Sequence, residues 1–175
     1  MKTYIGWVAT VFLFSCSSTK NSSALNDKAS SQSIQSACPD EGTCTIELLK
    51  NKSLNVKADE FGSIYYQLLD SEGTNVIRYT YDKIVPEGLQ DGNYREEIVF
   101  EISNTNQTLT LTGKDLQQTK MLFGRFCFCR GQTGSYKVED GTLSLNQKDH
   151  SVQFELQFAN GKVPQLLSTI KVNLK

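Results

Sequence analysis

Apolar and polar residues alternate along most of the chain after Cys38. Within residues 97–102, Ile98, Phe100 and Ile102 would point to one side of a strand, and the residues between them to the other. A period of two is typical of antiparallel strands that pack one face on a core and leave the other in water. The same alternation occurs in residues 54–58, 109–111, 143–145, 152–158 and 170–174.

Turn-forming sequences separate these stretches, among them Ser71-Glu72-Gly73, Asp91-Gly92-Asn93 and Asn160-Gly161. One segment, Lys114–Met121, has the spacing of a short helix. The pattern predicts eight to ten strands in an all-β domain over residues 37–175. We expect an antiparallel β-sandwich, with a closed β-barrel as the alternative.

The start of the chain has a different pattern, in which one positive charge precedes a short apolar segment. Lys2 is followed by the largely apolar residues Tyr4–Phe14. Eleven helical residues span only about 16 Å, whereas the hydrocarbon core of a bilayer is about 30 Å thick. The sequence therefore predicts a signal peptide over residues 1–15 rather than a transmembrane anchor.

The end of this segment, Leu13-Phe14-Ser15-Cys16, resembles the lipobox of bacterial lipoproteins. Phe14 is bulkier than the usual residue at its position, and an ordinary secretory signal with an incidental cysteine is the alternative. The resemblance implies that Cys16 carries a covalent diacylglycerol and acyl lipid, which would hold the protein to a membrane of the cell envelope on its extracytoplasmic side. In lipoproteins sorted by the residue after the cysteine, Ser17 in place of Asp implies the outer membrane.

A serine-rich stretch follows the lipid-attachment residue. Eight of the twenty residues 17–36 are serine, and only Leu25 and Ile34 are large and aliphatic. Such a segment buries too little apolar area to offset its chain entropy. We therefore expect residues 16–36 to be the lipidated N-terminus and a flexible linker.

Four cysteines remain in the predicted domain: Cys38, Cys44, Cys127 and Cys129. An even number outside the cytosol favours two disulfides. In an extended strand, the sulfurs of Cys127 and Cys129 would lie about 6–7 Å apart on one face. We therefore expect both to be bridged to Cys38 and Cys44, brought together by a turn over residues 39–42. A Cys38–Cys44 loop beside a Cys127/Cys129 dithiol is a second pairing, and a four-cysteine zinc site is a third arrangement.

The residues around Cys127 and Cys129 include the candidate binding residues Arg130, Gln132, Ser135 and Tyr136, which could form a polar rim. A disulfide-locked loop without a ligand is the alternative. The segment Cys127–Gly131 is similar to the C-x-C-R-G segment of uncharacterised envelope lipoproteins, a resemblance that implies no activity. We expect the strand that contains it to be central and buried.

Charge and residue types limit the function. The net charge of −1 provides no basic field for nucleic acid. The single histidine, His150, lies in a polar turn with no spacing for a metal site or a catalytic triad. Glu96, Glu97 and Glu101 could supply the carboxyl pair of a glycosidase, but a solvated strand face explains them as well.

These observations predict a membrane-anchored extracytoplasmic lipoprotein whose domain is a non-catalytic binding or interaction module of the cell envelope. An envelope protein or a small ligand would be its partner. The alternative is a carbohydrate- or cell-wall-active enzyme that uses carboxylates brought together in space. A purely structural or inhibitory surface protein is a third hypothesis. No catalytic residue, metal or cofactor other than the lipid is assigned.

Overall fold

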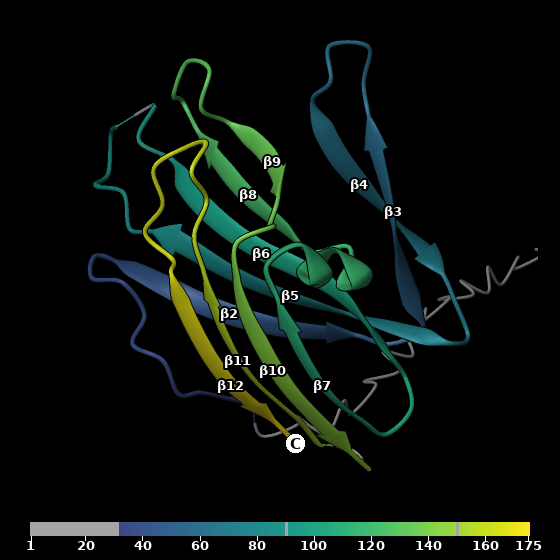
Figure 1. Cartoon of the computed structure of the whole chain (residues 1–175). Coiled ribbons are helices and arrows are strands. Elements are labelled where there is room, and N and C mark those ends of the chain that lie inside the picture. The colour runs from purple at the N-terminus through teal and green to yellow at the C-terminus, as the bar shows by residue number, and fades with distance from the viewer. Residues whose placement is uncertain (1–31, 90, 150) are drawn as a thin grey trace, which may run out of the picture.

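The computed structural model describes residues 32–89, 91–149 and 151–175. The predicted signal peptide, Cys16, residues 17–31 of the linker and His150 lie outside the described residues. The described chain forms two antiparallel sheets that face each other (Figure 1). This arrangement confirms the all-β, sandwich-like fold predicted by the alternation.

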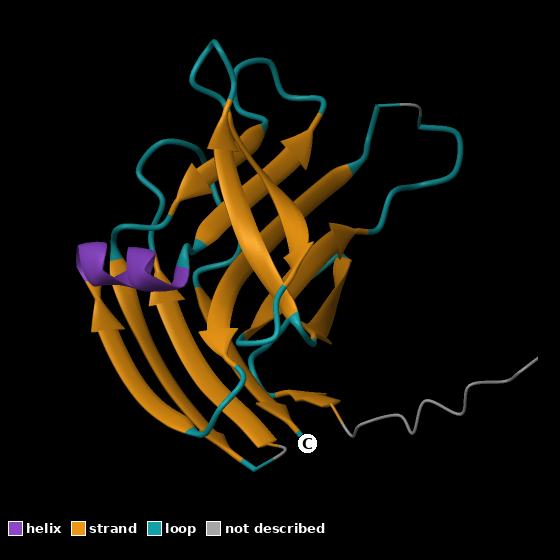
Figure 2. Ribbon diagram, turned by 90° about the vertical axis from the view of Figure 1, so that its right-hand side faces the viewer, coloured by secondary structure: helices purple, strands orange, loops and turns teal. Residues whose placement is uncertain are grey.

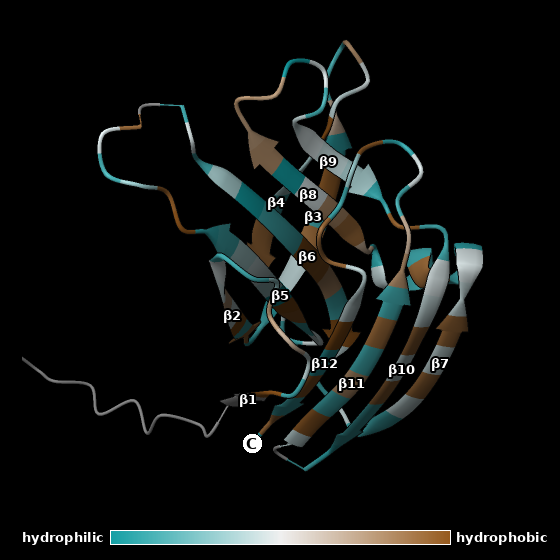
Figure 3. Cartoon of the chain, turned by 90° about the vertical axis from the view of Figure 1, so that its left-hand side faces the viewer, coloured by the Kyte–Doolittle hydropathy of each residue, from teal (hydrophilic) through white to brown (hydrophobic). Residues whose placement is uncertain are grey.

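The smaller sheet has five strands in the order β1-β12-β11-β10-β7. Its inner face is apolar and its outer face polar, which Figure 3 shows as alternating bands along β7, β10 and β11. Leu143 on β10, for example, lies opposite Leu111 on β7 and Leu156 on β11. The strands are β1 (Gln32–Ile34), β7 (Gln107–Thr112), β10 (Gly141–Lys148), β11 (Ser151–Phe158) and β12 (Thr169–Leu174).

The larger sheet has seven strands in the order β2-β5-β6-β8-β9-β4-β3. Each sheet of the described chain ends in two edge strands, so the alternative of a closed barrel is wrong. The strands are β2 (Gly42–Leu49), β3 (Lys52–Ala58), β4 (Ile64–Asp70), β5 (Thr74–Lys83), β6 (Tyr94–Ser103), β8 (Leu122–Cys127) and β9 (Gly134–Lys137).

The main core lies between the sheets. Tyr79, Tyr81, Phe100 and Phe123 of the larger sheet are fully buried there. The ring of Phe100 meets that of Phe154 edge-on, with centroids 5.3 Å apart. A 3₁₀ helix, η1 (Gly113–Thr119), occupies most of the predicted helical segment.

A second, smaller core lies on the outer face of the larger sheet. The β3–β4 hairpin folds over this face, and Leu54 packs with Val76, Val99 and Leu122. Glu101 holds the hairpin in place, because its Oε2 accepts a hydrogen bond of 2.8 Å from the Leu54 amide. The outer face of β5 and β6 is therefore covered in part rather than fully solvated.

The described fold begins before the predicted domain boundary at residue 37. Strand β1 falls inside the predicted linker and pairs with β12, with Ile34 opposite Val172. The sandwich therefore includes the last part of residues 16–36.

The expected disulfide pairing is wrong. The structure joins Cys38 to Cys44 and Cys127 to Cys129. Both bridges are therefore local, and neither the cross-bridged pairing nor the zinc arrangement occurs. The second pairing predicted the Cys38–Cys44 loop correctly but expected a dithiol where the structure has a bond. Strand β8 ends at Cys127, and the chain is no longer extended beyond it. The Cα atoms of Cys127 and Cys129 are therefore only 5.1 Å apart, closer than an extended strand allows.

Candidate functional site

Four connecting loops lie at the same end of the sandwich, at the top of Figure 1 and again at the top of Figure 2, where that end is seen from the side. They join β3 to β4, β5 to β6, β8 to β9 and β11 to β12. Cross-strand pairing brings two of them side by side, because Tyr94 at the start of β6 lies opposite Cys127 at the end of β8. Loops held by a rigid scaffold are where binding residues concentrate.

Below these loops, a groove of about 840 Å³ opens on the outer face of the larger sheet. Side chains from β4, β5, β6 and β8 line it, together with the ends of the two neighbouring loops. Its volume falls in the range of about 300–1,000 Å³ that is usual for small-ligand sites. The groove is therefore the candidate functional site.

The most buried charged residue that lines the groove is Glu97 on β6, which is 7% exposed. The hydroxyl of Tyr66 on β4 donates a hydrogen bond of 2.8 Å to its Oε1. Burial raises the pKa of the Glu97 carboxyl above its ordinary value, and the Tyr66 bond and the charges of Arg78 and Arg95 partly oppose that rise. Burial and the neighbouring carboxylate likewise raise the pKa of Tyr66 to about 12.

An ion pair forms the polar wall of the groove. Arg95 Nε lies 2.7 Å from Asp82 Oδ1, and its Nη2 lies 3.2 Å from the other carboxylate oxygen. The two residues are directly opposite each other on β5 and β6. A two-point contact between a guanidinium and a carboxylate fixes the orientation of both groups.

Two phenylalanines form the aromatic wall, which adjoins the ion pair because Phe126 on β8 is the cross-strand partner of Arg95 on β6. Phe126 and Phe128 line the groove and are 38% and 83% exposed. The ring of Phe126 lies over Gly124, where a Cβ atom would come within 2.6 Å of its Cε2. The expectation of a buried strand thus holds for most of β8 but is wrong at its end, where the phenylalanines face the groove.

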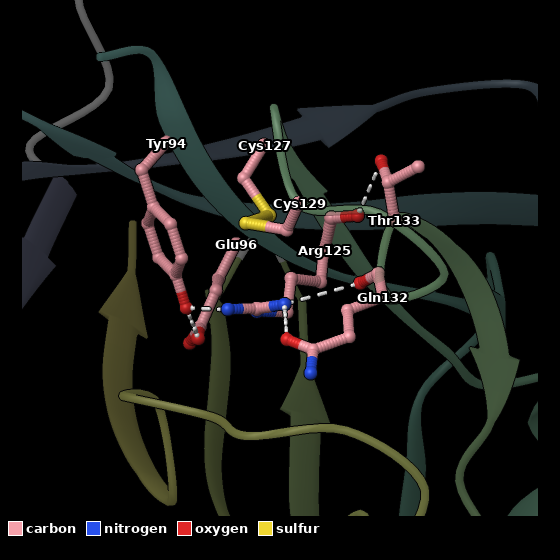
Figure 4. The surroundings of a disulfide bond; sticks show 7 residues. All are labelled: Tyr94, Glu96, Arg125, Cys127, Cys129, Gln132 and Thr133. Atoms are coloured by element: carbon pink, nitrogen blue, oxygen red, sulfur yellow. Dashed lines mark hydrogen bonds between the residues drawn. A yellow bond between two sulfur atoms is a disulfide. The ribbon is translucent and has the colours of Figure 1, made fainter. Parts of the chain in front are cut away.

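On the inner face of the sheet, a partly buried polar network connects the end of β8 to β6 (Figure 4). The Arg125 guanidinium lies over the ring of Tyr94, 5.2 Å from its centroid, and donates a hydrogen bond of 2.9 Å to Gln132 Oε1. The Tyr94 hydroxyl accepts a bond from Arg125 and donates one to Glu96. This chain of bonds connects the β8–β9 turn and its disulfide to β6.

Glu96 extends the network to the loop between β11 and β12. Its side chain is fully buried, and its carboxylate accepts bonds of 2.7 Å from the amides of Leu166 and Leu167. The hypothesis of a solvated strand face is therefore wrong for Glu96 and Glu97. Alternation alone could not reveal this, because their burial depends on segments distant in sequence.

The four predicted rim residues do not come together at the groove. Gln132 is bonded to Arg125, Ser135 pairs with Ile64 on β4, and Tyr136 packs against the main core. Arg130 is exposed in the β8–β9 turn. None of the four is among the described residues that line the groove.

Three residues of the site were not predicted from the sequence: Tyr66, Asp82 and Arg95. One signal was present in the sequence, because Val76 and Val99 fall on the faces of β5 and β6 that alternation assigns to water. Apolar residues there indicate a covering segment. They do not say which segment covers them.

In the part of the chain that the structure describes, no three His, Cys, Asp or Glu side chains gather as metal ligands. No described helix has the length and apolar character needed to cross a membrane.

Comparison of the chain with protein-family models, with curated proteins and with solved structures gives no match. The fold and the site therefore define its class: an all-β protein of two antiparallel sheets with a ligand-sized groove on the outer face of the larger one.

Proposed function

We propose that this protein is a membrane-anchored, extracytoplasmic lipoprotein of the cell envelope that binds a ligand without transforming it. The lipid would be attached at Cys16, and residues 17–31 would separate the sandwich from the membrane. The groove between β4 and the outer face of β5, β6 and β8 would be the ligand site.

The groove itself is the observation that supports a binding role. Its size suits a small ligand or part of a larger one, and aromatic and charged walls face the same space. Two of its three acidic groups are engaged within the protein, since Asp82 is paired with Arg95 and Glu97 with Tyr66. Side chains held in this way can orient a ligand at a low cost in side-chain entropy.

The anchor is tested by metabolic labelling with palmitate, followed by membrane fractionation of the full chain and its Cys16→Ala variant. We expect the natural chain to carry label and to sediment with membranes, and the variant to lose both properties. A Cys16→Ala variant that still carries palmitate and sediments would overturn the lipoprotein proposal.

One observation favours the enzyme as a second candidate. Asp82 and Glu97 line the groove on the same face and are diagonal neighbours across β5 and β6. The backbone positions of diagonal neighbours are about 7–8 Å apart, so the carboxyl groups of two such side chains could reach the separation of about 6.5–9.5 Å that inverting glycosidases use. Sensitive assays for new reducing ends on a panel of polysaccharides separate the two candidates. The binding proposal predicts no release, and turnover abolished by Glu97→Gln would establish the enzyme.

A further inference from the structure

The groove has a floor that offers a peptide little free backbone. Its floor strands β5, β6 and β8 each have a neighbour on both sides in the sheet. Over most of their length, the backbone N–H and C=O groups of these strands are already used in the ladder, whereas an added peptide strand needs a sheet edge. The β8–β9 pairing ends at Arg125 and Gly134, so only the last residues of β8 lack a neighbour on that side. A ligand on these strands would therefore be recognised mainly by side chains.

The aromatic wall offers a fixed apolar surface. The ring of Phe126 rests on Gly124, where the missing side chain leaves room for it, and part of the ring remains exposed. Phe128, which follows the end of β8 and lies between two cysteines that are bonded to each other, also lines the groove. An exposed aromatic surface held in place binds a flat apolar ligand face at a low cost in side-chain entropy.

The polar wall carries both signs of charge in near balance. The lining residues include three carboxylates and two cations, and Asp82 and Arg95 already neutralise each other. A strongly charged ligand would have to break that pair or lie beside a charge of its own sign. A neutral ligand with many hydroxyl groups would use the remaining donors and acceptors, because each hydroxyl both donates and accepts.

A buried acceptor at the bottom of the groove completes this pattern. In the described residues, the Glu97 carboxylate accepts a single hydrogen bond, from Tyr66. An ionised carboxylate has about four acceptor positions. Glu97 lines the groove, and the ring of Phe126 lies beside it, over the cross-strand partner Gly124, so a ligand here would meet hydrogen-bond acceptors and ring carbon side by side.

We propose that the groove binds a neutral glycan, with one sugar ring stacked on Phe126 and its hydroxyl groups bonded to Glu97, Arg95 and Asp82. A pyranose has the two surfaces that the groove requires, a face of C–H groups and an edge of hydroxyls. This inference rests on the proposed function and names the ligand class of the same site.

The test uses the full chain, purified in a detergent that contains no sugar, because a glycoside detergent would compete for the groove. Binding is measured by titration calorimetry with neutral tetra- to hexasaccharides built from glucose, mannose, xylose or N-acetylglucosamine. An uncharged peptide and an acidic oligosaccharide of similar length serve as comparison ligands. We expect saturable binding of at least one neutral oligosaccharide and weaker binding of both comparison ligands.

Single substitutions test whether the oligosaccharide binds in the groove. Phe126→Ala and Glu97→Gln should each weaken it about tenfold or more, as loss of a central contact does. Gly124→Ala should weaken it too, because the added methyl group displaces the Phe126 ring while keeping it in the protein. Phe61→Ala, at another exposed phenylalanine outside the groove, is the matched control and should leave affinity unchanged.

Three results would overturn the inference: no binding of any neutral oligosaccharide, tighter binding of the peptide or the acidic sugar, or equal affinities of Phe126→Ala and Phe61→Ala. Circular dichroism of each variant checks that it is folded. If no neutral oligosaccharide binds, the lipoprotein proposal still stands, because palmitate labelling of Cys16 is measured independently. A binder that also cleaves its sugar would instead contradict the non-catalytic role and leave the ligand class intact.

Discussion

The hydroxyl of Tyr66 donates a hydrogen bond of 2.8 Å to the carboxylate of Glu97, and this bond connects the β3–β4 hairpin to the sheet beneath it. Tyr66 lies on β4 and Glu97 on β6, strands that are not neighbours in the sheet. The bond therefore exists only because the hairpin folds over the outer face. It fixes the position of the carboxylate at the bottom of the groove.

Removing this bond should destabilise the protein. Tyr66→Phe leaves a buried carboxylate without its donor, and we expect a loss of about 1–3 kcal/mol in the free energy of unfolding at pH 7. Urea unfolding of the two proteins measures it. Tyr65→Phe, at a more exposed neighbouring hydroxyl on the same strand, is the control, and an equal effect of both changes would refute the role of the bond.

The raised pKa of Glu97 gives stability a specific pH dependence. Because the folded-state pKa lies above the unfolded value of about 4.3, the stability that this group contributes is complete below that pH and is lost as pH rises through the folded pKa. Glu97→Gln removes the titration. The natural protein should therefore lose stability relative to the variant between pH 4 and pH 7, measured by urea unfolding at both values. A difference that stays constant, or grows in favour of the natural protein, would contradict the raised pKa.

Glu96 should anchor the loop between β11 and β12. Glu96→Ala leaves the amides of Leu166 and Leu167 without their acceptor, and we expect a loss of about 3 kcal/mol together with faster amide exchange at both residues. Glu155→Ala, which breaks an exposed ion pair with Lys171, should cost about 0–1 kcal/mol. Unchanged exchange at the two leucines would show that Glu96 does not hold the loop.

The disulfide pairing can be read from a tryptic digest without reduction. Residues 29–50 contain no internal cleavage site and hold both Cys38 and Cys44, and residues 126–130 hold Cys127 and Cys129. Each bond should therefore stay within one peptide, which is lighter than its reduced form by two hydrogen atoms. A species that links the two peptides would show the cross-bridged pairing instead. In the chain-entropy account, closing the larger of these small loops contributes roughly 2 kcal/mol.

The hairpin itself should depend on Leu54. Leu54→Ala removes the buried side chain that packs on Val76 and Val99, and we expect a loss of about 2–4 kcal/mol. Limited proteolysis should then cut more rapidly within residues 59–63. Leu69→Ala, on the adjacent strand but half exposed, should change stability by no more than about 0.5 kcal/mol. Equal effects of the two substitutions would contradict the second core.

The strands were predictable from local sequence. Alternation identifies residues such as Phe100, Phe154 and Leu156 as core residues. In each strand of a sandwich, successive side chains point in turn to the core and to the outer face. Turn sequences separate the strands because they favour chain reversal wherever they occur. Both signals depend only on neighbouring residues, so a sequence carries them directly.

The groove was not predictable in this way. Glu97 is buried because a hairpin from residues 52–70 folds over it, and Phe126 is exposed because the chain turns away after β8. The disulfide pairing was missed for the same reason, since an extended geometry was assumed at Cys127 and Cys129 where the strand ends. Long-range folding decides each of these features, and alternation contains no information about it.

Hydrogen–deuterium exchange of the full chain, with and without a saturating neutral oligosaccharide, tests the glycan groove most directly. We expect slower exchange in the segments that border the groove: the start of β6, the end of β8 and the turn after it. Exchange on β10 and β11 should not change, because these strands belong to the five-stranded sheet, which does not line the groove. Protection confined to β10 and β11, or no protection at the groove, would contradict the assignment of the groove as the ligand site.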